Sequence, residues 1–352
     1  MHMADALLSP TVGATMWLTS AAAISYSIAK INNDELTEKK IPIMAVAGAF
    51  VFAAQMINFT IPGTGSSGHI GGGILLASLL GGFPGLLVIS TVLMIQCLFF
   101  ADGGLLALGC NIFNLGVVPC LIIYPLLFKP ILKNKFTSKG ICITSIIAAI
   151  ASLQIGAFCV VLQTQASGIT ELSFKTFAIL MQSIHLVIGV VEGIITAGVL
   201  RFVYKIEPQI LENANTKITI GKLVPFHNKM IVLIAITIAI GGGLSIFASS
   251  YPDGLEWAIN KTAKTSLHTV NDHGNKKPLL ETTARIQNIT AFMPDYDYKL
   301  SEEHSSSKGK SVAGIIGSGL TFLLAGGTAF IISITKKKRK KCIPVSVKQN
   351  NF

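Results

Sequence analysis

The segment that decides the fold runs from Phe83 to Ala101 and reads FPGLLVISTVLMIQCLFFA, without one charged side chain. It lies within a longer stretch, from Lys40 to Lys129, in which Asp102 is the only Asp, Glu, Lys or Arg. An apolar run of about 20 residues has the length of a helix that crosses the hydrocarbon core of a bilayer. The sequence therefore predicts an all-α integral membrane protein.

The composition of the whole chain agrees with a membrane protein. Only 13% of the 352 residues are charged, against about 25% in soluble globular chains. The hydrophobic share is 51% and the mean hydropathy is +0.63. These values exclude an ordinary cytosolic enzyme, and the 33 glycines suit closely packed transmembrane helices.

The apolar runs also predict a topology. Lysines place the loops around Lys40 and Lys129 in the cytoplasm, so an even number of spans separates them. That parity counts a short run at 70–80 as a span and puts the N-terminus outside. The seven predicted spans of a membrane domain, 1–205, lie near 11–29, 41–60, 70–80, 83–101, 104–128, 140–163 and 176–200.

A second module is predicted after this domain. A cytoplasmic linker, 206–229, leads into a module at 230–352 with two spans near 230–249 and 312–334. The polar segment between these spans, about 250–311, is expected outside, and the basic tail in the cytoplasm. No cleavable signal peptide is recognisable, so we expect a free, uncleaved N-terminus on the outer face.

Charge and cysteine content exclude several other readings. The net charge is +11, but the basic run Lys336–Lys341 directly follows an apolar segment and is typical of a topology anchor. We therefore expect no nucleic-acid partner. The six cysteines include no CxxC pair, which argues against a disulfide framework and a thiolate zinc site. GxxxxGK[ST], GxSxG and HExxH motifs do not occur, so the sequence does not predict an enzyme.

Nitrogen donors at two places indicate a metal site. A chain that begins Met1-His2 offers the α-amine, the His2 amide and the His2 imidazole in fused, nearly coplanar chelate rings. His69, in a glycine-rich loop at the outer end of a span, is a candidate fourth donor. Four coplanar nitrogens favour Ni(II) or Cu(II) over tetrahedral zinc. Residue types alone leave two alternatives open, a disordered N-terminus and a solvated or capped loop histidine.

Five segments together resemble one family: 1–10 (MHMADALLSP), 49–59 (AFVFAAQMINF), 66–69 (SSGH), 102–109 (DGGLLALG) and 185–193 (HLVIGVVEG). They are similar to the CbiM/NikM family, the substrate-binding membrane subunits of energy-coupling-factor (ECF) transporters for cobalt and nickel. The resemblance implies a seven-helix S-component bundle in the cell membrane. It also implies that Met1, His2 and His69 hold the metal.

The same resemblance implies partners and a cargo. Ni(II) or Co(II) would be the transported ion, with no organic cofactor. The partners would be a separate ECF-type ATPase subunit, which supplies the energy, and a transmembrane scaffold (T) subunit. Nickel is slightly favoured, because the start Met-His-Met-Ala-Asp is more similar to nickel-type members. In the second module, Pro252–Ala258 (PDGLEWA) resembles the small N-type partner of these systems, NikN/CbiN-like, fused in cis.

Other polar residues are candidates to support this site. His185 and Glu192 are seven residues apart and share a helix face, and Gln55 and Asn58 lie three apart on the second span. Helix-packing hydrogen bonds are the alternative for these four residues. The small residues at Ala45, Ala49 and Ala53 form a stripe that is a candidate docking face for a partner subunit, with internal packing as its alternative.

Two other classes of function remain open from sequence. One is an ion-gradient-driven secondary metal carrier, which predicts inverted repeats around midplane charges. The other is a membrane-anchored sensor or structural protein whose outer segment binds a ligand. Changes at the N-terminus would be tolerated by a sensor, whereas they would abolish uptake through the predicted site.

Overall fold

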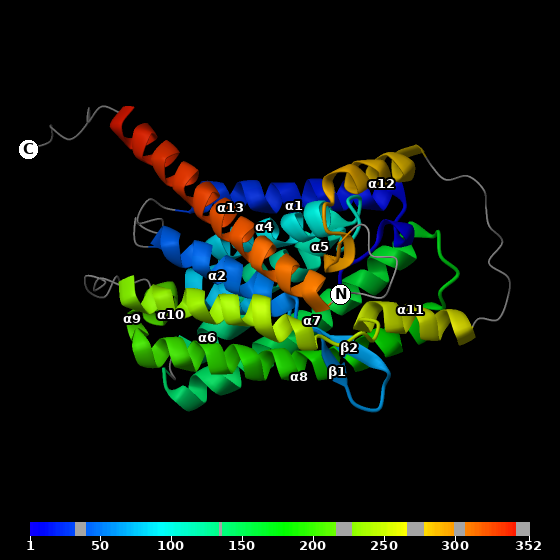
Figure 1. Cartoon of the computed structure of the whole chain (residues 1–352), viewed down its shortest axis with the longest axis horizontal. Helices are drawn as coiled ribbons and strands as arrows, with labels where there is room; N and C mark the ends of the chain where they lie inside the picture. The colour runs from blue at the N-terminus through cyan, green and yellow to red at the C-terminus, as the bar shows by residue number, and fades with distance from the viewer. Residues whose placement is uncertain (32–39, 134–135, 216–226, 266–277, 299–306, 343–352) are drawn as a thin grey trace, which may run out of the picture.

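The structure is a computed structural model of the chain, and it describes residues 1–31, 40–133, 136–215, 227–265, 278–298 and 307–342 (Figure 1). Parts of several predicted segments lie outside these described residues. They are residues 32–39 of the first cytoplasmic loop, 134–135 of the loop after Lys129, 216–226 of the predicted linker, 266–277 and 299–306 of the predicted outer segment, and the tail after Cys342.

The described residues are mostly helical. In chain order the elements are η1 (Asp5–Leu7), α1 (Pro10–Lys30), α2 (Lys40–Gln55), β1 (Phe59–Ile61), β2 (Ser66–Gly68), α3 (Gly73–Leu80), α4 (Gly82–Phe100), α5 (Leu108–Ile112), η2 (Phe113–Phe128), α6 (Lys129–Lys133), α7 (Ser138–Ser167), α8 (Phe174–Ile206), α9 (Pro208–Asn215), α10 (His227–Ile238), η3 (Ala239–Gly243), η4 (Leu244–Phe247), α11 (Gly254–Thr265), α12 (Pro278–Thr290), η5 (Pro294–Tyr296) and α13 (Ser307–Cys342). The antiparallel β1 and β2 hairpin departs from the all-α prediction, with Phe59 opposite Gly68.

Local sequence explains where the first helices begin and turn. Ser9 caps α1, since its Oγ accepts a hydrogen bond from the Val12 amide at 3.4 Å, and Pro10 follows at the first helical position. Between α3 and α4, Gly81 has φ of 92°, a conformation that suits glycine and lets the two helices join without a longer loop. The helices α7 and α8 then form a long antiparallel pair.

Five helical segments in the described part of the chain are long and apolar enough to cross a membrane: Gly82–Phe100, Leu108–Lys133, Ser138–Ser167, Phe174–Ile206 and Lys308–Lys336. Two further apolar helices, Lys40–Gln55 and Ile231–Phe247, are shorter. The structure thus supports a multi-pass membrane protein, but helix length does not confirm the predicted count of seven in the first domain.

The predicted short span near 70–80 is only partly helical. With eight residues, α3 rises about 12 Å, less than the roughly 30 Å of a hydrocarbon core. It is preceded by an extended segment, and its Leu79 reaches an apolar cavity that Ile43, in the first turn of α2, also lines. The segment therefore runs from the hairpin end of the bundle to the end where α2 begins.

The C-terminal helix α13 packs along α2 in antiparallel order (Figure 1). At Gly317 the two helices approach so closely that an added Cβ would lie 2.0 Å from the Phe52 ring. Gly314 contacts the backbone of Gly241 in η3 in the same way. The module at the C-terminus is therefore docked on the membrane domain rather than tethered beside it.

This docking determines where the predicted alanine stripe lies. Ala45, Ala49 and Ala53 are all buried. A Cβ added to Gly326 of α13 would lie 3.1 Å from Ala45, and one added to Gly241 would lie 3.4 Å from Ala53. The stripe receives the chain's own second module in this arrangement, so docking of a separate subunit there would require α13 and η3 to leave. Partner docking at the stripe stays a prediction.

Candidate metal site at the N-terminus

The N-terminal segment is drawn into the protein instead of lying in solvent. Met1 is 5% exposed and Met3 is 0% exposed. Asn111 holds the main chain of Met3 from both sides, because its Oδ1 accepts from the Met3 amide at 2.8 Å and its Nδ2 donates to the Met3 carbonyl at 3.3 Å. The Gly104 amide donates to the same carbonyl at 2.9 Å. These contacts fix the path of the first residues, so the N-terminus is held against the protein and is not loose in solvent.

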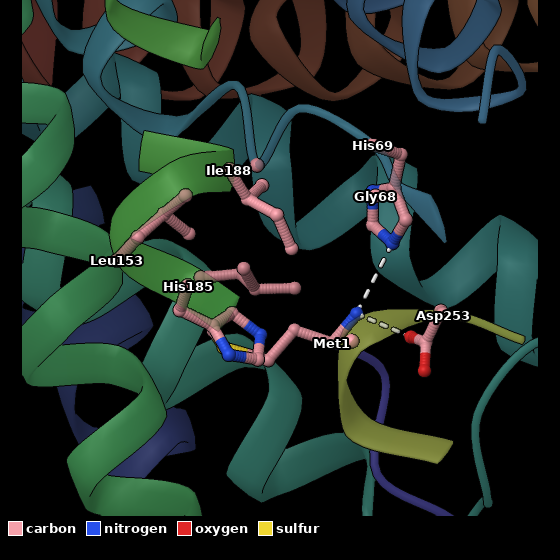
Figure 2. A pocket seen from close by; sticks show the side chains of 10 residues that line it. Met1, Gly68, His69, Leu153, His185, Ile188 and Asp253 are labelled. Carbon is pink, nitrogen blue, oxygen red and sulfur yellow. Dashed lines mark hydrogen bonds and ion pairs between the residues drawn. The ribbon is translucent and has the colours of Figure 1, made fainter. Parts of the chain in front are cut away.

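The α-amino nitrogen of Met1 lies between two side chains that are far away in sequence (Figure 2). It is 3.1 Å from Nε2 of His69 and 2.7 Å from Oδ2 of Asp253. His69 Nδ1 is 3.0 Å from the Ile70 carbonyl, which can only accept a hydrogen bond. Nδ1 therefore carries the proton, and Nε2 presents its lone pair to the amine.

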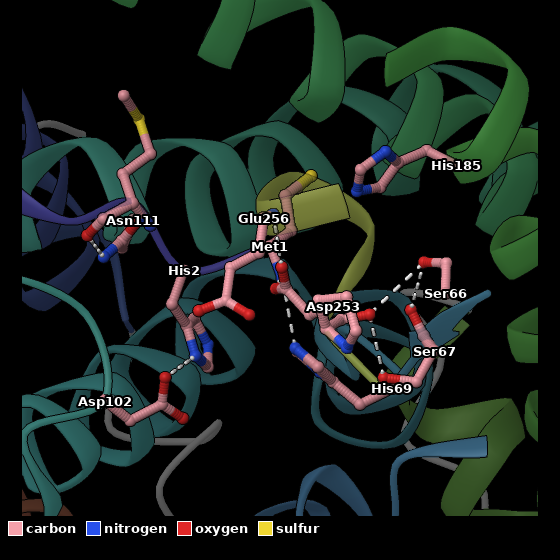
Figure 3. A network of polar contacts seen from close by, with 12 residues as sticks. Met1, His2, Ser66, Ser67, His69, Asp102, Asn111, His185, Asp253 and Glu256 are labelled. Carbon is pink, nitrogen blue, oxygen red and sulfur yellow. Dashed lines mark hydrogen bonds and ion pairs between the residues drawn. The ribbon is translucent and has the colours of Figure 1, made fainter. Parts of the chain in front are cut away.

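His2 lies beside His69, with the two ring centroids 5.1 Å apart (Figure 3). Nδ1 of His2 contacts Oδ1 of Asp102 at 2.7 Å. The other ring nitrogen, Nε2, is buried and has no hydrogen-bond partner among the described residues. The second oxygen of Asp102 accepts a hydrogen bond from the Tyr296 hydroxyl at 2.5 Å, so a residue of the second module fixes the carboxylate that contacts His2.

The loop that carries His69 is held by two of the predicted support residues. Glu192 accepts hydrogen bonds from the amides of Gly71 and Gly72 at 2.8 and 2.9 Å. Gln55 donates from Nε2 to the Gly71 carbonyl at 2.8 Å. Gly72 has φ of 76°, and an added Cβ would meet Val51 at 2.5 Å, so this close approach requires glycine.

The other two support candidates lie differently. Asn58 is outside the cavity at the amine, and its main-chain carbonyl accepts from the Ser249 amide at 2.7 Å. His185 does line that cavity, a small space of about 10 Å³ next to Met1 and Asp253 (Figure 2). Of the four predicted support residues, the structure brings His185 close to the N-terminus and brings Glu192 and Gln55 to the loop that carries His69. The side chain of Asn58 forms no hydrogen bond with either among the described residues.

The second module reaches the site through the PDGLEWA segment. Asp253 precedes α11, and its Oδ1 accepts from the Glu256 amide at 2.8 Å, while Oδ2 contacts the amine. The Pro252 carbonyl accepts from the amide of Ser67, two residues before His69, at 2.8 Å. Trp257 donates from Nε1 to the Thr64 carbonyl at 2.9 Å. Asp253 therefore serves two purposes, as a helix cap and as the partner of the amine.

Asp253 and Tyr296 were not among the predicted site residues. Asp253 lies 252 residues from Met1 in sequence, and no local pattern links the two. The only available signal was the short PDGLEWA resemblance just outside a predicted span. Asp102, the only carboxylate between Lys40 and Lys129, contacts Nδ1 of His2 at 2.7 Å and was not predicted as a partner of the site.

The electrostatics of the site keep both carboxylates ionised. Burial would raise the pKa of Asp253, but the Met1 ammonium outweighs burial and holds that pKa well below its usual range. Burial likewise opposes ionisation of Asp102, whereas His2 and the hydrogen bond from Tyr296 lower its pKa. Burial first, and then the Met1 ammonium, lower the pKa of His69 to about 3. His69 is consequently a neutral nitrogen donor near neutral pH.

The donors available here are of an unusual kind. In the part of the chain that the structure describes, no three His, Cys, Asp or Glu side chains form a cluster that could hold a metal. A site at this place must therefore use main-chain nitrogens, here the Met1 amine and the His2 amide. Closing a chelate ring from the His2 amide requires Nδ1 of His2, which now contacts Asp102. Metal binding in that mode would need the contact with Asp102 to open.

Two family descriptions match the chain. Residues 2–210 match the family CbiM, described as "Cobalt uptake substrate-specific transmembrane region", and residues 227–334 match the PDGLE domain. The first match covers more than half of the chain, and the second covers the module that carries Asp253.

Individual proteins and a solved structure are also similar. A protein of Haloquadratum walsbyi, named a candidate metal transport protein, is 36% identical over 61% of this chain and 97% of its own length. One of Archaeoglobus fulgidus, named a candidate fused nickel transport protein NikMN, is 33% identical over 63% of this chain and 71% of its own. A crystal structure of a transition metal transporter, 28% identical, covers 59% of this chain and 94% of its own, with a TM-score of 0.52.

Proposed function

The chain belongs to the CbiM family of membrane proteins for metal uptake, and from that premise we propose that it is the subunit that captures Ni(II) or Co(II) for an ATP-driven ECF-type transporter. It is a metal transport protein and not an enzyme. Under this proposal the ion binds at the outer face in a square-planar set of nitrogens. These are the Met1 amine, the His2 amide, the His2 imidazole and Nε2 of His69.

The single observation that carries the proposal is the position of the Met1 amine, 3.1 Å from Nε2 of His69 and next to the His2 ring. Four nitrogens in one plane would favour Ni(II) over tetrahedral zinc by geometry, because selectivity among divalent ions depends on geometry and ligand type more than on raw affinity. Asp253 would remain as an outer partner that orients the amine, the role that carboxylates have in many metal sites, whereas Asp102 would release Nδ1 of His2 to the ion.

The proposal includes a topology and partners. The first domain would cross the cell membrane seven times with the N-terminus outside, and the basic tail would lie in the cytoplasm. A separate ATPase subunit and a transmembrane scaffold subunit would drive release of the ion, which requires a conformation that pulls one donor away. Nickel is our preferred cargo because a similar protein with the same two modules is named for nickel transport.

The test is metal accumulation by cells that express this chain with its energising subunits. We expect His69→Ala to abolish uptake, because it removes one of four donors. The matched control is Thr60→Ala in the same hairpin, where the hydroxyl only contacts Ser249 and does not line the cavity. Uptake by the His69→Ala variant at the rate of the Thr60→Ala control would refute the proposed site.

A further inference from the structure

His185 presents a buried ring nitrogen that the proposed site does not use. Its side chain belongs to α8 and is 1% exposed. Nδ1 lies 2.8 Å from the Met181 carbonyl and must donate to it, because a carbonyl only accepts. Nε2 therefore carries a lone pair. That nitrogen has no hydrogen-bond partner among the described residues, which is rare for a buried polar atom.

The ring of His185 borders the same small cavity as the proposed donors (Figure 2). The cavity of about 10 Å³ has room for roughly one water molecule or one ion. Besides His185, its polar lining includes the Met1 amine, His69 and Asp253, while apolar side chains such as Leu153 close it. The lone pair of Nε2 can coordinate a cation in this cavity, and it offers no hydrogen to an anion.

The contacts along α8 place this nitrogen relative to the proposed site. Glu192 holds Gly71 and Gly72, and one turn earlier Ile188 is so close to Gly68 that an added Cβ would lie 2.6 Å away. A further turn earlier, His185 lies beside Gly254 of the second module, where an added Cβ would be 3.2 Å from its ring. In the proposed topology α8 begins at the outer face, so His185 lies outward of His69 and below α11.

We propose that Nε2 of His185 is a transit ligand, which binds the incoming Ni(II) or Co(II) before the ion reaches the Met1 amine and His69. This inference rests on the proposed function. The ion loses water when it enters this small cavity, and a nitrogen donor on that path replaces part of the lost hydration. Because the resting site is complete without it, His185 exchanges the ion and does not retain it.

A transit ligand has a kinetic signature that a structural histidine lacks. Its removal raises one barrier that the ion crosses in both directions, so association and dissociation slow by the same factor. The equilibrium dissociation constant, Kd, stays unchanged. A ligand of the resting site would instead weaken Kd through faster dissociation, and a residue that only packs would change neither rate.

The experiment uses the full-length chain in detergent with Ni(II) as the probe, and measures both rate constants and Kd. For His185→Ala we expect both rates to fall about tenfold or more with Kd unchanged. The matched control is Leu186→Ala, the next residue of α8, which is 47% exposed and should behave as wild type. His185→Gln replaces the nitrogen donor by an amide oxygen at a similar size, so we expect rates between those of wild type and Ala. Where the Ala variant does not fold, the Gln variant carries the test, with both rates below those of wild type and Kd unchanged.

Each remaining outcome has a defined meaning. Wild-type rates in both His185 variants, or a weaker Kd caused by faster dissociation, would overturn the transit ligand. His69→Ala, measured in parallel, tests the proposed function separately. If it binds Ni(II) like wild type, or if wild type does not bind Ni(II), the proposed site itself fails and the inference falls with it.

Discussion

One extra residue placed before Met1 is the most direct perturbation of the proposed site. A glycine at this position converts the terminal amine of Met1 into a peptide nitrogen. It also moves the new terminus by up to about 3.5 Å, the length of one extended residue. The Met1 nitrogen now sits 3.1 Å from His69 and 2.7 Å from Asp253, in a cavity of only about 10 Å³. That space holds about one water, so an added residue does not fit without displacing the segment.

The size of the effect follows from the contacts that are lost. The added glycine removes the Met1 amine, one of four proposed donors, and also leaves the Asp253 carboxylate without the cation that now contacts it. Loss of an outer partner of a metal ligand typically lowers affinity by 10 to 100-fold. Loss of the ligand itself should therefore weaken Ni(II) binding by about 100-fold or more, which corresponds to roughly 2.7 kcal/mol.

The assay is equilibrium binding of Ni(II) to the purified chain, measured as the affinity that His69→Ala removes, because the extended terminus Gly-Met-His can chelate Ni(II) by itself through its amine, two peptide nitrogens and the imidazole. Metal accumulation in cells is a second readout. Mass spectrometry confirms the mature N-terminus of each protein. The control carries one extra glycine after Gly168, at the end of α7, where an added Cβ meets nothing within 4 Å. Affinity within a factor of about three of wild type, in a protein shown to retain the added glycine, would refute the role of the amine.

Three further predictions test the surroundings of the site. Asp253→Asn should weaken Ni(II) binding by about 10 to 100-fold, because the amine loses a charged partner; unchanged affinity in a binding titration would contradict this role. Gly104→Ala should also weaken binding, since the added Cβ would lie 1.8 Å from the Asp5 carboxylate and displace the N-terminal segment, whereas Gly198→Ala, with open space around it, should bind like wild type. The unfolding free energy of the metal-free chain should fall as the pH decreases from 6.5 to about 3, because His69 binds a proton there only when unfolded. The slope from His69 is at most about 1.4 kcal/mol per pH unit, and a denaturant series that gives the same slope for His69→Ala would exclude this cause.

Much of the fold could be predicted because the bilayer imposes a simple rule on sequence. Long uncharged runs become helices, since a helix satisfies its main-chain hydrogen bonds within one segment when it lies in lipid. The segments around Phe83 and His185 obey that rule, and the structure has long apolar helices at both places. The short run at 70–80 follows it only in part, because the three residues before α3 are not helical, and Glu192 and Gln55 satisfy main-chain polar groups of Gly71 and Gly72.

The candidate site could be predicted only in part, because residue identities indicate possible donors but not which distant segments meet. Residue types could name Met1, His2 and His69 as candidate donors, because a chelate at a free N-terminus depends on the first residues, but only the family resemblance favoured a metal site over a disordered terminus and a solvated loop histidine. The alanine stripe at 45–53 shows the limit. Small residues predict a close helix contact, but they do not identify which helix fills it, and the structure places the chain's own α13 and η3 there.

The amino-acid order alone determined that this chain resides in a membrane and carries a nitrogen-rich N-terminus, because hydropathy and donor chemistry are properties of the residues themselves. Only the tertiary structure decided that Asp253 meets the Met1 amine and that Tyr296 supports Asp102 against His2. Those pairs span 194 to 252 residues of sequence. They form because the close approach of glycines docks the second module on the first, an outcome of helix packing that no local pattern specifies.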